Sequence, residues 1–194
     1  MARCRLGDTT AFDSLVRRWQ APVARVLSRL TGDDTFASRT AGGEAGLPLR
    51  AELDDLSQEV FLRVLRACDT WEGRSAFSTW IYRIAVNVTR DAFRRRQTWR
   101  RGTRRKTPDP PAPAAIEQAS RRERERLVNA ALASLPAKLR EPLVLRHFGD
   151  LTFAEAAEAL GLPVGTVKSR VKSGLVRLRE ELQRRGVTED ELEE

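Results

Sequence analysis

The sequence predicts an all-α protein of two small helical domains joined by a flexible linker that is basic and proline-rich. Apolar residues recur at spacings of three and four along most of the chain, which is typical of helices with one buried face. Between residues 151 and 182 a short helical pattern, a glycine-containing turn and a second helical pattern follow one another. A run of basic residues followed by closely spaced prolines separates the two halves of the chain, as expected of a tether.

The expected boundaries follow from these patterns. The first domain covers residues 1–97 and includes a long loop at 31–52, and the linker covers residues 98–119. The second domain covers residues 120–185, and residues 186–194 form an acidic tail. With 194 residues, 41% of them apolar, the chain is long enough to bury a core in each domain.

The composition favours an intracellular protein with a polyanionic partner. The chain has 35 Lys and Arg against 27 Asp and Glu, for a net charge of +8. Its cysteines, Cys4 and Cys68, and its single histidine, His147, fit a reducing cytosol and predict neither a disulfide nor a metal site. Apolar runs stay shorter than the roughly 18 residues of a membrane span. We therefore expect a cytoplasmic protein without cofactor, metal or membrane insertion.

The first helix is expected to follow Thr10 and to end near Gly32. Its apolar residues recur at helical spacings and predict a core face, comprising Phe12, Leu15, Val16, Trp19, Val23, Val26, Leu27 and Leu30. The residues that follow, up to Glu52, lack such a period and are rich in Gly, Ala and Thr. We expect them to form a long surface loop.

The second helix is expected to begin at Leu53. Its apolar side comprises Leu53, Leu56, Val60 and Val64, and its early turns hold polar side chains at Asp54, Asp55, Gln58 and Glu59. Carboxylates in a first turn stabilise the helix dipole by about 0.3–1 kcal/mol each at an exposed site. The acids therefore serve either this dipole or a face that docks on another protein, and the sequence leaves both interpretations open.

A loop with Trp71 and Gly73 leads into the third helix, SAFSTWIYRIAVNVTRDAFRRR. Its predicted core face comprises Phe77, Trp80, Ile81, Ile84, Ala85, Val88 and Ala92, and another face carries Arg83, Asn87, Arg90, Asp91 and Arg94. This mixture of cations, an amide and a carboxylate can read base edges as well as phosphates, whereas attraction to phosphates needs only cations.

Arginine and lysine make up most of the stretch from Arg94 to Lys106. We expect this stretch to be unfolded or a frayed helix end, and either a solvated charge run or a collector of DNA phosphates. The next helix is expected over residues 120–135. The segment AKLREPLVLRHF then forms another, in which Pro142 should kink the helix or shift its start.

The last two helices carry strong end signals. Thr152 and Glu155 have the spacing of a capping box, Gly161 suits a left-handed C-cap, and Pro163 prevents the first helix from continuing. The second helix then restarts near Val164. We expect its buried stripe to be Val167, Val171, Leu175 and Leu178, with the hydroxyl and cationic residues Lys168, Ser169, Arg170, Lys172 and Ser173 outside it.

This pattern is that of a helix-turn-helix, whose second helix enters the DNA major groove. On pattern alone it could also be a plain corner of two helices with a solvated basic face.

The motifs DDLSQEVFLRVLRA, FSTWIYRIAVNVTRDAFRRR, LPAKLREPLVLR and GLPVGTVKSRVKSGLVRLRE carry a family resemblance. In order and spacing they resemble regions two and four of the sigma-seventy family of bacterial transcription initiation factors. The short form resembles the extracytoplasmic-function (ECF) group. The resemblance covers roughly residues 7–30, 53–97 and 120–182, and it is specific because the whole ordered set matches.

The resemblance implies a non-enzymatic subunit that directs core RNA polymerase to promoters and opens the DNA. Docking on the clamp helices of the largest subunit would use Asp55, Gln58 and Glu59, and the polymerase flap is a further implied contact. The implied minus-ten contacts are Trp71, Arg74, Ser75, Arg83, Asn87, Arg90, Asp91 and Arg94. The implied minus-thirty-five contacts are Thr166, Lys168, Ser169, Arg170, Lys172 and Ser173. An anti-sigma protein is a further candidate partner.

The chain departs from the family pattern at three points: its long loop at 31–52, Arg74 where an acidic residue is common, and Ser173-Gly174 where Arg-Ala is frequent. The loss of the frequent arginine at Ser173 affects which promoter sequence is read rather than the mode of binding.

Two other classes of protein fit the sequence less well. A plain helix-turn-helix regulator would not need Trp71 and Asn87 on a second basic module. A recombinase would need a nucleophile with supporting catalytic residues, and the sequence shows no such arrangement.

Overall fold

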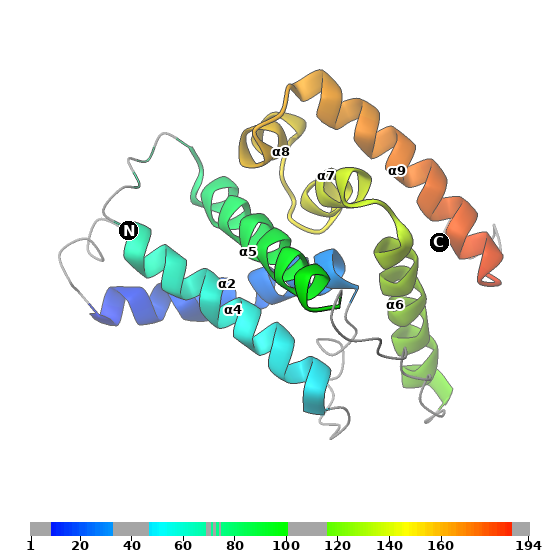
Figure 1. The fold of residues 1–194 in the computed structure, drawn as a ribbon, viewed down its shortest axis with the longest axis horizontal. Helices are drawn as coiled ribbons and strands as arrows, with labels where there is room; N and C mark the ends of the chain where they lie inside the picture. The colour runs from blue at the N-terminus through cyan, green and yellow to red at the C-terminus, as the bar shows by residue number, and fades with distance from the viewer. Residues whose placement is uncertain are drawn as a thin grey trace.

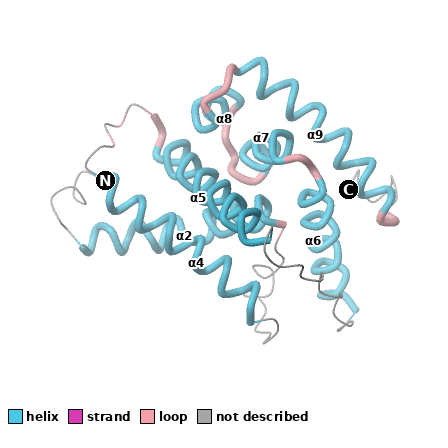
Figure 2. The backbone as a smooth tube through the Cα atoms, in the orientation of Figure 1, coloured by secondary structure: helices cyan, strands magenta, loops and turns pink. Residues whose placement is uncertain are grey.

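The computed structural model describes residues 9–32, 47–68, 71, 73, 75–100 and 116–187, and their regular structure is helical (Figures 1 and 2). The all-α prediction is confirmed. In chain order the helices are α2 (Thr9–Thr31), α4 (Leu47–Ala67), α5 (Phe77–Arg100), α6 (Ile116–Ser134), α7 (Ala137–His147), α8 (Phe153–Leu160) and α9 (Val164–Arg184).

The first region consists of α2, α4 and α5, which pack against one another on one side of the molecule (Figure 1). The predicted core face of α2 is inside, with Val23, Val26 and Leu27 fully buried. Val60 and Val64 of α4 meet this face, as do the buried residues of α5, which include Ile81, Ala85 and Val88. Burial of such side chains is the main source of stability for a bundle of this kind.

The second region, α6 to α9, contains the predicted helix-turn-helix. The amide of Glu155 donates to Thr152 Oγ1 at 3.2 Å, and the amide of Thr152 donates to Glu155 Oε2 at 2.8 Å. Gly161 ends α8 with φ of 65°, which a residue with a Cβ adopts only with strain. Pro163 is the N-cap of α9. The end signals predicted from the sequence are therefore confirmed.

The buried stripe of α9 differs from the prediction. Leu175 is 43% exposed, whereas Gly174 is buried against α7. A Cβ on Gly174 would lie 3.3 Å from the carbonyl oxygen of Leu139, so the missing side chain lets the two helices approach closely. Residues 174 and 175 both fit a helical spacing after Val171, and close backbone packing rather than hydrophobicity selects the glycine.

Helix bounds also differ from the prediction. α4 begins at Leu47 rather than Leu53 and so includes part of the expected loop. Pro48 is compatible with this start because a first-turn amide has no acceptor within the helix. α5 continues to Arg100 and α6 begins at Ile116, so both helices extend into the expected linker. The rest of that loop, the rest of the linker and the tail from residue 188 lie outside the described residues.

α7 runs without interruption from Ala137 to His147 and includes a buried Pro142. The helix begins at the first residue of the expected segment and continues through Pro142, so the expected shift of the helix start is wrong.

The two regions contact each other in the structure. α2 packs on α6 and α7, and α5 packs on α8, so the buried cluster is continuous from one region to the other (Figure 1). This contact lies between residues far apart in sequence and was not predicted.

The capping box of α8 gives a testable prediction. Replacement of Thr152 by Ala removes the side-chain acceptor of the Glu155 amide and should lower the free energy of unfolding by about 1 kcal/mol in urea titrations. Thr152→Ser keeps a hydroxyl oxygen at this position and should retain most of the stability. Equal stability of the wild type and the Ala variant would contradict a stabilising role of the cap.

Candidate nucleic-acid interface

The polar face of α9 lies on the N-terminal half of the helix that follows the turn. Lys168, Ser169, Lys172 and Ser173 are exposed, while Thr166 and Arg170 are half-buried. The Ser169 hydroxyl donates to the carbonyl oxygen of Thr166 at 3.0 Å, which leaves its oxygen free to accept. All six predicted residues therefore share one helix end, and it is the end that a helix-turn-helix presents to DNA.

Phe153 of α8 was not predicted as part of this face. Lys168 Nζ lies 5.8 Å from the centre of its ring, and Arg146 Cζ of α7 lies 5.3 Å from the same centre. Cations within about 6 Å of a ring face are attracted to it. The ring therefore places a cation of α7 beside the polar face of α9.

The predicted face of α5 is only partly available to a ligand. Arg83 and Asn87 are exposed on one side of the helix. Asp91 accepts from Arg63 Nη1 of α4 at 2.9 Å and from Arg94 Nη2, also at 2.9 Å. The hydrogen bond from Arg63 lowers the pKa of Asp91, so this carboxylate stays charged.

Arg63 also donates from Nε to Glu59 Oε1 at 2.8 Å. It thereby connects one residue of the predicted docking set, Glu59, with one of the predicted DNA-contact set, Asp91. The sequence reasoning missed Arg63, although its position four residues after Glu59 is the usual spacing of a helical ion pair.

Arg90 contacts the second region and remains partly exposed. Its Nε and Nη2 donate to Oε1 and Oε2 of Glu141 in α7, at 2.8 and 2.6 Å. This paired geometry raises the pKa of Arg90. Arg90 therefore does not share the open face of Arg83 and Asn87 in this conformation.

Trp71 lies beside an aromatic cluster at the start of α5. Its ring makes an edge contact with Phe77 at 6.1 Å between centroids, and its centroid lies 6.4 Å from that of Trp80. Within the described part of the chain its buried Nε1 has no hydrogen-bond acceptor. Ser75 is half-buried nearby in sequence, and Arg74 lies outside the described residues.

The acids of α4 are not in a first turn. Because α4 begins at Leu47, its first turn holds no acidic residue, and Asp55 lies further along the helix. The dipole interaction falls off within the first turn, so the dipole interpretation of these acids is wrong. Asp55 and Gln58 are exposed, and Glu59 is half-buried in its pair with Arg63.

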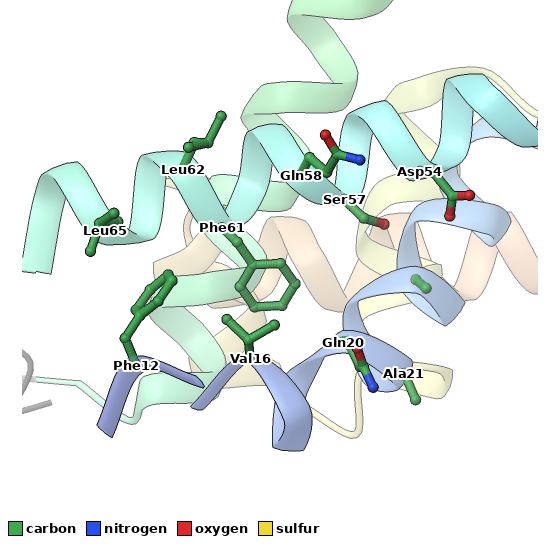
Figure 3. A pocket seen from close by; sticks show the side chains of 11 residues that line it. Phe12, Val16, Gln20, Ala21, Asp54, Ser57, Gln58, Phe61, Leu62 and Leu65 are labelled. Carbon is green, nitrogen blue, oxygen red and sulfur yellow. The ribbon is translucent and has the colours of Figure 1, made fainter. Parts of the chain in front are cut away.

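An apolar groove between α2 and α4 adjoins Gln58 (Figure 3). Phe12 and Val16 of α2 face Phe61 of α4 across it. Leu62 and Leu65, each 45% exposed, form its rim. A polar edge beside an exposed apolar surface is typical of a protein interface.

Among the described residues, no three His, Cys, Asp or Glu side chains are placed to hold a metal ion. A search of the same residues for a helix long and apolar enough to cross a membrane found none.

Comparison with known proteins identifies the family. A model of sigma-70 region 2 matches residues 15–100, and a model of sigma-70 region 4 matches residues 125–178. The chain is 32% identical to the ECF RNA polymerase sigma-E factor of Haemophilus influenzae, over 87% of this chain and 86% of that protein. This sequence belongs to the ECF group of the sigma-70 family. It is therefore a sigma factor, which directs RNA polymerase to promoters, and the family to which it belongs is non-catalytic.

Other relatives agree. The RNA polymerase sigma-H factor of Pseudomonas aeruginosa is 31% identical to this sigma factor over 87% of the chain and 84% of that protein. A solved structure of CnrH in complex with the cytosolic domain of CnrY has a TM-score of 0.65 at 24% identity and covers 94% of both chains. The sigma factor RpoE of Bartonella quintana, in complex with the anti-sigma factor NepR, has a TM-score of 0.66 at 20% identity, covering 89% of this chain and 97% of that one. These two structures share the fold.

Proposed function

We propose that this sigma factor docks on core RNA polymerase through α4 and reads the promoter at two places, the minus-ten element through α5 and the minus-thirty-five element through α9. The observation that carries the proposal is the presence, on one chain, of two polar faces mixing cations with other hydrogen-bonding groups. A regulator that binds DNA alone needs only the face on α9. The domain division is also proposed, with the first domain ending in α5 and the second beginning in α6.

Docking on the clamp helices of the polymerase is assigned to Asp55 and Gln58. Both side chains are exposed, and the groove beside Gln58 supplies apolar surface. The carboxylate of Glu59 already pairs with Arg63. We therefore assign Glu59 to docking through this pair with Arg63. The polymerase flap is the proposed contact of the second region, and the cytoplasm with its nucleoid is the proposed location, since promoter DNA lies there.

Strand opening is assigned to Trp71 together with the face of Arg83 and Asn87. Stacking of an unpaired base on an aromatic ring contributes about 1–3 kcal/mol. This is comparable with the few kcal/mol needed to unstack one base, so binding energy can support opening without ATP. The remaining minus-ten assignments are Arg74, Ser75, Arg90, Asp91 and Arg94.

An anti-sigma protein is a proposed further partner. The solved structure of CnrH is a complex with the cytosolic domain of CnrY, and that of the sigma factor RpoE of Bartonella quintana is a complex with the anti-sigma factor NepR. The apolar groove between α2 and α4 offers a surface on which an amphipathic helix of such a partner could bind.

If α9 reads bases, Arg170→Ala should lose about 1–3 kcal/mol of discrimination at particular base pairs. Binding to a library of minus-thirty-five variants measures this loss. Arg177→Ala, which removes an exposed cation further along α9, is the matched control and should weaken binding uniformly at most. A uniform loss for Arg170→Ala would reduce its role to phosphate contact.

Replacement of Trp71 by Ala should impair strand opening more than initial binding of the duplex. Permanganate reactivity of unpaired thymines in complexes with polymerase measures opening, and filter binding measures the first step. Trp71→Phe retains an aromatic ring and should keep most of the reactivity. Unchanged reactivity of the Ala variant would remove the base-stacking assignment.

The double variant Asp55→Ala, Gln58→Ala should recover less core polymerase in a pull-down, because it removes two exposed polar groups of the proposed docking face. Asp13→Ala removes an exposed carboxylate from α2 and is the control. Wild-type recovery by the double variant would exclude this face as the docking site.

A further inference from the structure

The contact between the two regions includes a two-point ion pair. Arg90 of α5 and Glu141 of α7 are joined by hydrogen bonds of 2.8 and 2.6 Å. The side chain of Glu141 is only 12% exposed and that of Arg90 is 39% exposed. Shielding from solvent on the glutamate side strengthens such a pair relative to one on an open surface.

A second polar contact also joins the two regions. Arg29 of α2 donates from Nη1 to Asn129 Oδ1 and, at 3.3 Å, to the carbonyl oxygen of Glu125, both in α6. Its guanidinium also lies 4.8 Å from the ring centre of Phe148, after α7. Two arginines of the first region therefore hold three segments of the second.

In the structure the first region packs directly on the second, and we call this arrangement closed. The closed arrangement does not allow simultaneous contact with both promoter elements. The elements are named for positions about 25 base pairs apart, which corresponds to roughly 85 Å of duplex at 3.4 Å per base pair. A compact chain of 194 residues has a radius of gyration of about 16 Å and a diameter of about 40 Å. This inference rests on the proposed function, which assigns the two promoter elements to α5 and α9. To contact both elements at once, the two helices must separate on the promoter.

We propose that the Arg90–Glu141 pair is a latch that holds the free sigma factor closed and competes with promoter DNA for Arg90. In the closed form the Glu141 carboxylate is hydrogen-bonded to the guanidinium of Arg90, which is assigned to the minus-ten contact. Opening the interface releases Arg90 for a phosphate or a base, and frees α9 to reach its own element. The latch therefore couples domain separation to the appearance of a complete DNA-contact face.

The interface also contains a feature that favours opening. Arg140 of α7 lies over the ring of Phe93 of α5 at 5.4 Å, and within the described residues its buried Nε has no hydrogen-bond partner. Burial lowers the pKa of Arg140 because it disfavours the charged guanidinium. Separation of the regions exposes this nitrogen to water, which opposes the gain from the latch and makes closure reversible.

The test measures the shape of the free, full-length protein by small-angle X-ray scattering. Glu141→Gln removes the charge of the latch and should shift the ratio of open to closed molecules by about tenfold towards open, raising the radius of gyration. Arg29→Ala breaks the second contact and should shift it in the same direction. Glu180→Gln changes an exposed carboxylate of α9 and should leave the wild-type value.

Salt gives an independent reading, because it screens the partly exposed pair. The radius of gyration of the wild type should rise with the salt concentration, whereas that of Glu141→Gln should change less. The charge-swapped double variant Arg90→Glu, Glu141→Arg should regain compactness, which separates loss of the latch from loss of folding. The latch is wrong if the wild type is already extended at low salt, or if Glu141→Gln stays as compact as the wild type.

Promoter-directed transcription with limiting core polymerase separates the latch from the function on which it rests. Glu141→Gln should raise the initial rate, because a larger fraction of the factor is open. If scattering shows that the Glu141→Gln variant is open but its initial rate of transcription does not rise, the regulatory role of the latch is overturned. Failure of the wild type itself to direct transcription would instead overturn the proposed function, while the scattering result would stand.

Discussion

Burial of the apolar side of α5 fixes where the functional side chains of the first region lie. Ile81, Ala85 and Val88 have no exposed surface, so the helix cannot rotate without opening the core. Arg83 and Asn87 then point to solvent. Arg90 and Asp91 fall on the flanks of the helix, where α7 and α4 supply Glu141 and Arg63 as partners.

The two flanking pairs have different consequences for a DNA-binding protein. Asp91 would repel phosphate, but Arg63 and Arg94 surround it with positive charge. Exposed ion pairs contribute only about 0–1 kcal/mol each, so this network is better understood as holding side chains in position than as a source of stability. Arg90 pairs with a nearly buried carboxylate from the other region, so its environment depends on how the two regions are arranged.

The sequence was most informative where a structural signal is local. The capping box at Thr152 and the left-handed Gly161 were both predictable, because their partners lie within a few residues. The choice of Gly174 over Leu175 was not, since periodicity does not report how closely another helix approaches. The start of α4 at Leu47 was not predictable, because a proline beside it is more typical of a loop than of a helix. The contact between Arg90 and Glu141, 51 residues apart, has no local signal.

The contacts within the two regions differ in chemistry from part of the contacts between them. Within each region most of the fully buried side chains are aliphatic, such as Leu27 and Ile81 in the first and Leu143 in the second. Between the regions, arginines at 29, 90 and 140 make hydrogen bonds or ring contacts that water and phosphate can replace. The buried apolar cluster also continues from one region to the other, so separation exposes part of this surface as well as exchanging the arginine contacts for contacts with water or DNA.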